Sequence, residues 1–479
     1  MARMSGAPAP GARQIKQTAK APAVAGARGS WAMPRLSRGH YRWTELRLLA
    51  LPAVFMTLGL TTLLVVNGQK IDLAARTLPP LDAFTPVIGL LLALFAAHMA
   101  LNFIAPDADQ TLLPIAGMLS SIGVLMALRL GPDLGQTSLG SKQLVFVIIG
   151  LVLCVLTVWA TSDLRWLRNY PYVWAAAGAA LIAVTLVHAG GFDPNAPSRD
   201  VLSIGPGGLS FQPSELFKIC LVIFFASYVA ENMQTLSDGG RKFGPFTLPP
   251  VETLLPLFVM LGLALAIVVF ARELGLAALI LGVFLAMLYA GSSRISYVLF
   301  LGAIFALGSV VVFSVFSYAR SRVSLLTNAF DPNVYYGAPP NSSYQIVQGL
   351  VAFGSGGVFG QGFGLGHPTF VPVVTTDYIA AAFAEEFGFA GLLALIGLFM
   401  LLVYRGMRIA LRSRVPFNQL MAVGLTAVIG LQAVIILAGN LKLMPLTGVP
   451  LPFVAYGGSS LIANFIIIGL LLRLSRERS

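Results

Sequence analysis

Twelve apolar segments, each long enough to cross a lipid bilayer, constrain the fold of this 479-residue chain more than any other feature. A hydrocarbon core is roughly 30 Å thick, and about 18 or more mostly apolar helical residues span it. With 57% hydrophobic and 10% charged residues, the chain is too apolar for a soluble globular protein. The sequence therefore predicts an all-α polytopic membrane protein with about twelve transmembrane helices, at residues 46–68, 84–104, 112–130, 143–160, 172–190, 214–231, 251–270, 274–292, 295–318, 378–404, 417–439 and 452–472.

The basic residues between these segments predict the orientation of the chain. Lys and Arg resist translocation, so cytoplasmic connections carry them in excess. Here they fall in alternate connections, at Arg165, Arg168, Arg241, Lys242, Arg294, Arg405, Arg408, Arg412 and Arg414. We therefore expect both termini in the cytoplasm, and the connections at 191–213, 319–377 and 440–451 on the outer side.

The net charge of +12 does not indicate a nucleic-acid partner. The basic residues are spread over many connections without interleaved aromatic residues, so topology and anionic membrane lipids explain the excess better. Residues 1–45 are rich in Ala, Pro, Gly and Arg, and we expect them to form a disordered basic cytoplasmic tail. Cys154 and Cys220 lie in apolar segments, where we expect packed thiols.

One long connection, residues 319–377, separates the ninth and tenth apolar segments. A membrane protein with short connections elsewhere is expected to place its function in such a loop. The loop ends in Thr375-Thr376-Asp377, directly before an apolar helix. These residues are either an N-cap of that helix or the site of a functional carboxylate. Glu385 and Glu386 follow about 12 Å deeper in a continuous helix, so we assign them to structure or to cavity electrostatics.

Two pairs of charged residues stand at other segment ends. Glu215 and Lys218 have an i, i+3 spacing at the start of the sixth segment. They form either a structural salt bridge or polar groups of a cavity, since ionisable residues at membrane depth are costly. Arg272 and Glu273 occupy the very short connection between the seventh and eighth segments. They form either a charged turn or, with Glu215, the lining of an outward cavity.

A glycine-rich string at residues 354–362 lies within the long connection. It follows no buried strand and lies on the outer side, which argues against a nucleotide fingerprint. Its glycines allow the backbone to pack closely or to present N–H groups to an anion. His367 has no second ligand at metal-site spacing, so the sequence predicts no metal site there.

Four motifs in this order resemble the SEDS family (shape, elongation, division and sporulation), which includes RodA-, FtsW- and SpoVE-like proteins. They are Phe-Gln-Pro-Ser-Glu-Leu-Phe-Lys-Ile at 211–219, Ser-Tyr-Gln-Ile-Val-Gln at 343–348 with the glycines at 354–357, Thr-Asp-Tyr-Ile at 376–379 with Ala-Glu-Glu-Phe-Gly at 384–388, and Gly-Val-Pro-Leu-Pro-Phe-Val-Ala-Tyr-Gly-Gly-Ser-Ser at 448–460. The resemblance covers about residue 140 to the end. It divides the chain into extra amino-terminal helices at 46–140 and a SEDS-like core at 141–479.

The resemblance implies a glycosyltransferase of the bacterial cytoplasmic membrane. Such proteins polymerise lipid II into peptidoglycan strands on the outer face, in cell elongation, division or sporulation, together with a class B penicillin-binding protein. The family's essential carboxylate corresponds to Asp377. The substrate-binding candidates are Glu215, Lys218, Arg272, Glu273, Arg322, Gln345, Gln348, Ser355, Thr376 and Glu385. This chain has Arg272-Glu273-Leu274-Gly275 where many members have Pro-Asp-Leu-Gly.

The chemistry needs a base for the attacking sugar hydroxyl and charge stabilisation for a departing lipid pyrophosphate. Asp377 would be the base, and Lys218, Arg272 or Arg322, or a divalent cation near Asp377, would meet the phosphates. The lipid tails of the substrate would lie between helices, in an apolar groove, and membrane lipids would contact the protein. Two other classes stay open at this point. One is a flippase or transporter of lipid-linked precursors, and the other is a non-catalytic scaffold for a penicillin-binding protein.

Overall fold

The computed structural model describes residues 41–66, 84–188, 202–204, 209–238, 241–243, 246–248, 251–270, 272–337 and 342–476. The regular secondary structure of the described residues is helical apart from two antiparallel hairpins, β1 (Leu202–Ile204) with β2 (Leu209–Phe211) and β3 (Arg241–Phe243) with β4 (Phe246–Leu248). The longer helices are α2 (Ala50–Val66), α3 (Thr85–Ile104), α4 (Leu112–Asp133), α5 (Leu139–Ala160), α7 (Pro171–His188), α8 (Pro213–Glu231), α10 (Val251–Phe270), α11 (Leu274–Ser292), α12 (Ile295–Val315), α16 (Ile379–Arg412), α17 (Pro416–Asn440) and α18 (Gly458–Leu474). The shorter ones are α1 (Trp43–Leu48), α6 (Arg165–Asn169), α9 (Met233–Asp238), α13 (Ser317–Thr327), α14 (Pro332–Tyr335), α15 (Tyr344–Ser355) and the 3-10 turn η2 (Pro368–Phe370).

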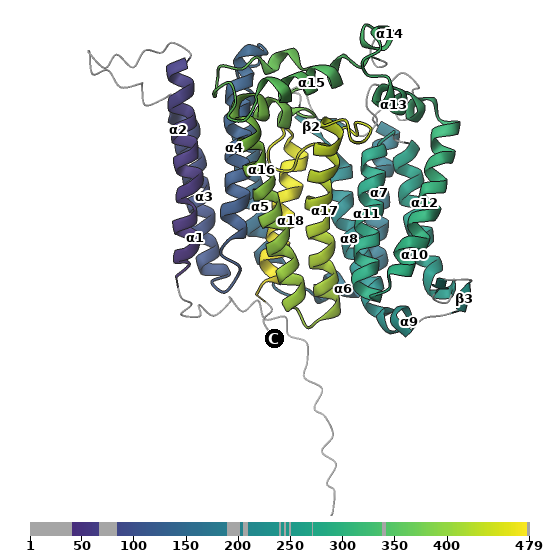
Figure 1. The fold of residues 1–479 in the computed structure, drawn as a ribbon. Coiled ribbons are helices and arrows are strands. Elements are labelled where there is room, and N and C mark those ends of the chain that lie inside the picture. The colour runs from purple at the N-terminus through teal and green to yellow at the C-terminus, as the bar shows by residue number, and fades with distance from the viewer. Residues whose placement is uncertain are drawn as a thin grey trace, which may run out of the picture. The chain divides into compact units, whose positions relative to one another are not determined.

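Each predicted apolar segment coincides with one of the longer helices, which confirms the all-α membrane class (Figure 1). Among the described residues, nine helices are long and apolar enough to cross a membrane, the first of them running from α1 through α2. The remaining three apolar helices are shorter by this measure, at Pro171–Val184, Leu255–Ala266 and Gly458–Leu474. The count of twelve spans therefore stays a prediction.

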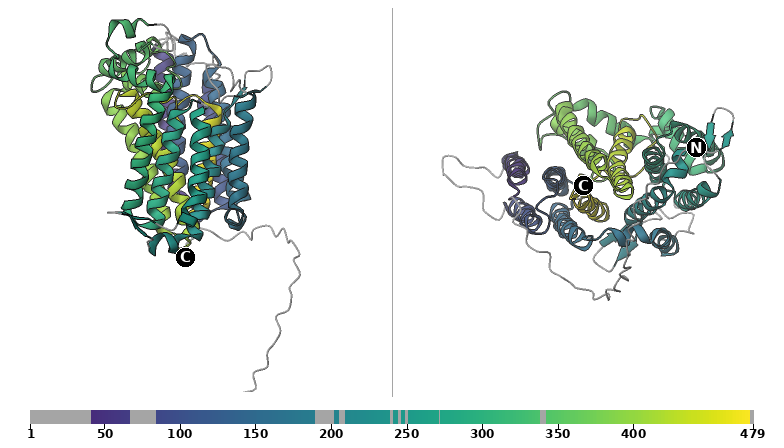
Figure 2. Two further views of the ribbon diagram at one scale, coloured as in Figure 1. Left: turned by 90° about the vertical axis from the view of Figure 1, so that its right-hand side faces the viewer. Right: turned by 90° about the horizontal axis from the view of Figure 1, so that it is seen from below.

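Burial divides the helices into central and peripheral ones (Figures 1 and 2). In α4 and α8, 89% of the most apolar window is buried, whereas the value for α12 is 6%. Small residues permit the close central packing: a Cβ on Gly469 of α18 would lie 2.7 Å from the Cys154 carbonyl oxygen of α5. Without a hydrophobic driving force in lipid, such close contact is what holds helices together. Cys154 and Cys220 are buried free thiols, as predicted.

The predicted disordered tail of residues 1–45 ends earlier in the structure, because residues 41–45 are ordered. Its residues 1–40 lie outside the described residues, but Arg42 and Glu45 are fully buried at the start of α1. The Arg42 guanidinium donates to the carbonyls of Ala105 and Ala108, at 2.8 and 2.9 Å, and pairs with Glu45. Glu45 also contacts Nδ1 of His98 at 2.6 Å. These bonds order residues 41–45, of which Trp43 begins α1, and fix α1 to the α3–α4 connection.

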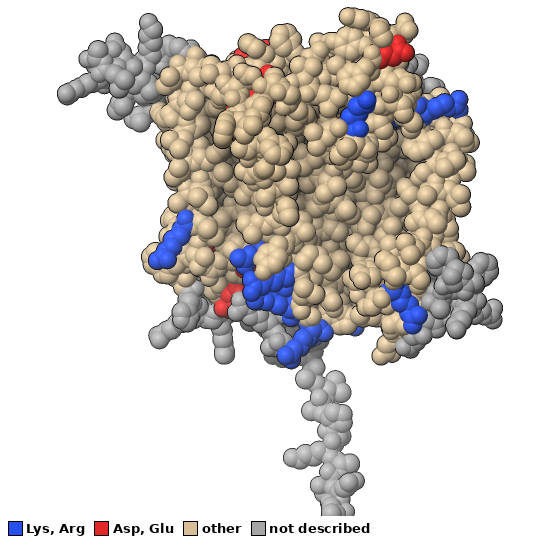
Figure 3. All heavy atoms as spheres, viewed as in Figure 1, with Lys and Arg blue, Asp and Glu red and all other residues tan. Residues whose placement is uncertain are grey.

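The long connection between α12 and α16 is not an irregular loop. It contains α13, α14, α15 and η2, and these elements lie at one end of the bundle, here called the loop end (Figure 1). The opposite end carries α6, α9 and the carboxyl end of α16, and is called the basic end. Lys and Arg gather toward this end on the face shown in Figure 3. α16 thus connects the two ends.

Candidate functional site

Asp377 lies in a turn at the loop end, directly before α16. The backbone N–H groups of Thr376 and Asp377 both donate to the Val373 carbonyl, at 3.3 and 3.1 Å. Val373 has φ = 54°, a left-handed conformation that is a genuine outlier for a β-branched residue. The N–H of Tyr456, in the last family-like motif, donates to the Thr375 carbonyl at 2.8 Å. Two distant motifs therefore fix the turn that presents Asp377.

The interpretation of Thr375-Thr376-Asp377 as an N-cap is wrong. α16 begins at Ile379, its N-cap residue is Tyr378, and no side chain caps it. The Tyr378 carbonyl accepts from the N–H groups of Ala381 and Ala382, at 3.0 and 3.2 Å, so the helix starts from this residue. The carboxylate of Asp377 is therefore not consumed in capping.

Burial raises the pKa of Asp377, and the Thr376 hydroxyl and the Arg322 charge partly oppose the shift. Arg322, on α13, donates from Nη1 to the Leu446 carbonyl at 3.5 Å. The ring of Tyr378 is buried, and a Cβ on Gly349 would lie 2.2 Å from it. Gly349 directly follows the Gln345–Gln348 motif of α15. Because it has no Cβ, it leaves the space that the ring of Tyr378, the residue after Asp377, occupies.

Two of the three predicted phosphate partners lie on or against α13. Arg322 is part of α13, and the guanidinium of Arg272 lies over the ring of Tyr318, 5.8 Å from its centroid. The Tyr318 hydroxyl donates to the Val269 carbonyl at 2.8 Å, which holds α13 against the end of α10. Arg272 itself has φ = 66°, and the Glu273 N–H bonds to the Val268 carbonyl at 3.0 Å. This is the geometry of a helix C-cap usually given to glycine.

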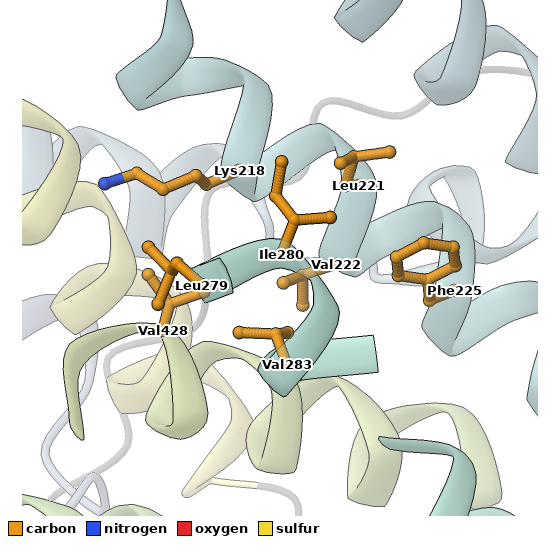
Figure 4. A pocket seen from close by; sticks show the side chains of 8 residues that line it. All are labelled: Lys218, Leu221, Val222, Phe225, Leu279, Ile280, Val283 and Val428. Atoms are coloured by element: carbon orange, nitrogen blue, oxygen red, sulfur yellow. The ribbon is translucent and has the colours of Figure 1, made fainter. Parts of the chain in front are cut away.

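Lys218, the third predicted partner, lies in a closed buried cluster. Its Nζ pairs with Glu215 at 2.8 Å and donates to the side-chain oxygen of Gln432 at 2.8 Å. Gln432 in turn donates to the Pro450 carbonyl at 2.8 Å. Figure 4 shows Lys218 beside a small apolar pocket, with its amino group pointing away from Phe225. The salt-bridge interpretation of this pair is confirmed, and the cluster ties α8 and α17 to the last motif.

Four other candidate residues form side-chain hydrogen bonds to groups other than Asp377. Gln345 donates to the Pro372 carbonyl at 3.2 Å, and Gln348 to the Tyr335 hydroxyl at 3.1 Å. The exposed Ser355 donates to the Ala352 carbonyl at 3.0 Å. Glu385 is buried and accepts from the His367 N–H at 2.9 Å, which agrees with a structural role.

The glycine string packs against a break in α16. Gly388, with φ = 70°, is non-helical and divides the helix into two parts. The N–H groups of Gln361 and Gly362 donate to the carbonyls of Glu385 and Glu386, and those of Phe389 and Ala390 donate to the carbonyls of Gly357 and Val358, all at 2.9–3.2 Å. Close packing of the backbone is thus the use of these glycines, because the break leaves polar groups that lipid cannot satisfy.

A second charged cluster lies beneath this break. Arg129 of α4 donates from Nε to Glu386 at 2.9 Å and from Nη2 to the Gly366 carbonyl at 3.0 Å, and it also pairs with Asp133. Sequence reasoning overlooked Arg129 and Gln432. The signal that could have found both is a polar residue inside an otherwise apolar segment.

An apolar groove opens near Arg322 and has a volume of about 440 Å³. Side chains of α10, α11 and α12 and residues 444–447 line it, among them Phe305, Phe313 and Leu446. Leu446 is also the residue whose carbonyl accepts from Arg322. The groove and the charged residues near Asp377 are therefore adjacent through the 444–447 segment.

The positive charge that the structure places near Asp377 is the guanidinium of Arg322. In the described part of the chain, no three His, Cys, Asp or Glu side chains gather at a possible metal site.

Comparisons with known proteins identify the family. Residues 108–479 match the sequence profile of the FtsW/RodA/SpoVE family, described as "Cell cycle protein". The peptidoglycan glycosyltransferase RodA of Mycobacterium tuberculosis is 33% identical over 443 residues, which cover 91% of this chain and 90% of that protein. The enzyme of the same name from Mycobacterium leprae is 34% identical over 393 residues, or 80% of this chain and 82% of that protein.

Solved structures agree with this assignment. A chain of a structure on the coordination of polymerization and crosslinking by a peptidoglycan synthase complex matches with a TM-score of 0.60 and 26% identity, over 78% of this chain and 98% of that chain. The Thermus thermophilus Rod shape determining protein RodA matches with a TM-score of 0.53 and 26% identity, over 78% and 97%. The protein is thus an integral protein of the bacterial cytoplasmic membrane. The profile match, the arrangement of helices and the four motifs together show that the chain belongs to the FtsW/RodA/SpoVE family.

Proposed function

We propose that this protein is a peptidoglycan glycosyltransferase that polymerises lipid II on the outer face of the cytoplasmic membrane. The observation that carries the proposal is the uncapped, partly buried carboxylate of Asp377 beside the Arg322 charge. The mycobacterial relatives are named for this activity, and they match this chain over most of their own length.

Asp377 acts as the general base in this proposal. The 4-hydroxyl of the acceptor lipid II attacks the anomeric carbon of the growing strand. A new C–O bond forms, the bond to the polyprenyl pyrophosphate breaks, and the hydroxyl proton passes to Asp377. A raised pKa makes the carboxylate a stronger base at neutral pH than an ordinary aspartate.

Arg322 and Arg272 bind the departing pyrophosphate and stabilise its charge, since guanidinium groups bind phosphate in a bidentate manner. The polyprenyl chain lies in the apolar groove of α10, α11 and α12, which reaches the 444–447 segment beside Arg322. Lys218 is engaged by Glu215 and Gln432, so it supports the last motif and does not contact phosphate directly.

The test of the chemistry is polymerisation of lipid II by the purified protein with its partner. Asp377→Asn should lower the rate by at least about 100-fold, the usual weight of a general base. Asp331→Asn makes the same chemical change at an exposed carboxylate of the same connection, outside the proposed site, and should retain most activity. Full activity of Asp377→Asn would remove this residue from the mechanism.

The proposed orientation places the loop end outside and both termini in the cytoplasm. The positions for a labelling test are Phe359, which is 84% exposed at the loop end, and Arg414, which follows α16 at the basic end. Both native cysteines are buried. A membrane-impermeant maleimide added to intact cells should label Phe359→Cys but not Arg414→Cys. The reverse pattern would place Asp377 on the wrong side for the reaction.

The proposed partner is a class B penicillin-binding protein that cross-links the new strands. Support comes from the solved synthase complex, whose title joins polymerization to crosslinking. Affinity purification of the full chain from its own membranes, followed by labelling with a fluorescent penicillin, should show a co-purifying penicillin-binding protein. Its identity would also distinguish elongation from division.

A further inference from the structure

A concave basic pocket lies at the basic end, between the last turns of α16 and the end of α18. Arg405, Arg408 and Arg412 line it together with Asp109, and it is a small depression at the surface. Ile409 and Leu474 give it an apolar part, and Ser475 completes it. The glycosyltransferase chemistry proposed above uses none of these residues.

The charges of this pocket are not balanced by the protein. Asp109 is the carboxylate in the lining, and it contacts Nη1 of Arg405 at 3.7 Å. Nε of Arg405 is buried without a hydrogen-bond partner. Within the described residues, the guanidinium groups of Arg408 and Arg412 have neither an ion pair nor a hydrogen bond. The pocket therefore carries an excess of positive charge and unused N–H donors.

The position along α16 places this charge at the depth of lipid headgroups. After the break at Gly388, the helix continues to Arg412 for a length of about 36 Å at 1.5 Å per residue. This exceeds a hydrocarbon core of roughly 30 Å, so the last turn reaches the headgroup region. The spacing of Arg405, Arg408 and Arg412 puts them on one face of the helix.

Two ordinary explanations account for basic residues here but not for the pocket. Arginine near a helix carboxyl end is favoured by the helix dipole, and cytoplasmic ends of membrane helices are generally basic. Both are satisfied by exposed side chains. Neither requires a concavity with apolar side chains in its wall and a buried, unpaired guanidinium nitrogen.

We propose that this pocket binds the headgroup of an anionic phospholipid. The guanidinium groups of Arg408 and Arg412 hold the phosphate oxygens through charge-assisted hydrogen bonds. Ile409 and Leu474 contact the beginning of the acyl chains. Basic pockets between helices on the cytoplasmic side are suited to such lipids.

The experiment measures lipid retention by the full-length protein in nanodiscs that contain phosphatidylcholine and phosphatidylglycerol in equal amounts. Native mass spectrometry after release reports which lipid stays bound. The test variant is Arg408→Gln with Arg412→Gln. The matched control is Arg165→Gln with Arg168→Gln, which removes two exposed basic residues at the same end, outside the pocket. We expect selective retention of phosphatidylglycerol by the wild type and by the control, and a loss of affinity of about 30-fold in the test variant.

Three outcomes would overturn the proposal: no preference for phosphatidylglycerol in the wild type, equal losses in test and control variants, or displacement of the lipid by millimolar inorganic phosphate, which would indicate a site for a free anion. Arg408→Lys with Arg412→Lys guards against a folding defect. This variant keeps the charge and should retain most of the bound lipid, and its failure to do so while the melting temperature is unchanged would contradict a charge-based site.

Discussion

The two charged clusters near the loop end differ in how completely their groups are paired. Arg129 is nearly buried and is bound by Glu386, Asp133 and the Gly366 carbonyl. Asp377 is only partly buried, and Arg322 acts on its charge without a direct ion pair in the described part of the chain. In the first cluster, here called closed, the guanidinium has three partners, although Oε2 of Glu386 is buried without a hydrogen bond. In the second, here called open, the carboxylate can exchange a proton and the arginine can receive phosphate. The difference indicates that the first cluster serves the fold and the second the chemistry.

The most severe test of this contrast removes Arg129. In Arg129→Met, Glu386 stays buried without its cation, which should cost about 3–5 kcal/mol of stability. Thermal unfolding in detergent measures the change. Adding Glu386→Gln removes the unpaired charge and should restore part of the loss. If Arg129→Met alone unfolds at the wild-type temperature, the closed cluster is not structural.

The glycine string offers a sharper test of the break above this cluster. A Cβ on Gly360, where φ is 84°, would lie 2.1 Å from the Glu386 carbonyl oxygen. Gly360→Ala should therefore destabilise the protein by about 2 kcal/mol. Gly357→Ala is the matched control, because φ is also positive there but no atom lies within 4 Å of the added methyl. Equal effects of both variants in thermal unfolding would show that only backbone conformation matters at these positions.

The carboxylate of Asp377 in the open cluster should make the rate of polymerisation depend on pH. A raised pKa means that Asp377 takes up its proton at a higher pH than an ordinary aspartate, and the protonated form cannot act as a base. The rate should therefore fall about tenfold per pH unit below this raised value. The same shift favours folding at low pH, and this contribution is lost as pH rises through the raised pKa. Asp377→Asn should thus be at least as stable as the wild type at neutral pH, and a clear loss of stability would assign Asp377 to the fold.

The smallest expected effect concerns Arg272, which has a left-handed conformation. Arg272→Gly removes this strain and should raise stability by up to about 1 kcal/mol, while it lowers polymerisation through loss of the cation near α13. Ser293→Gly, at φ = 55° on the other end of α11, relieves a similar strain without touching the site. Both should melt at slightly higher temperature, but only Arg272→Gly should lose activity. Unchanged activity would separate Arg272 from the phosphate.

Much of this arrangement could be predicted from the sequence because apolar length is a local property. The helix positions, the Glu215–Lys218 pair and the packed cysteines depend on residues within one segment. The broken α16 could not be predicted in this way. Gly388 becomes a break only because the glycine string lies beside it and bonds to its free backbone groups. The turn at Asp377 likewise depends on Tyr456, almost eighty residues away. Such pairings are properties of the folded chain.

The hydrogen bonds across the break in α16 carry a mechanical consequence. The string at 357–362 bridges the break, since four backbone hydrogen bonds join it to the helical residues on both sides of Gly388. Bending at the break would rupture these hydrogen bonds. A tilt that the surrounding lipid imposes on the part of α16 after Gly388 is therefore transmitted to the part before it. The turn that carries Asp377 moves together with that part as a rigid unit.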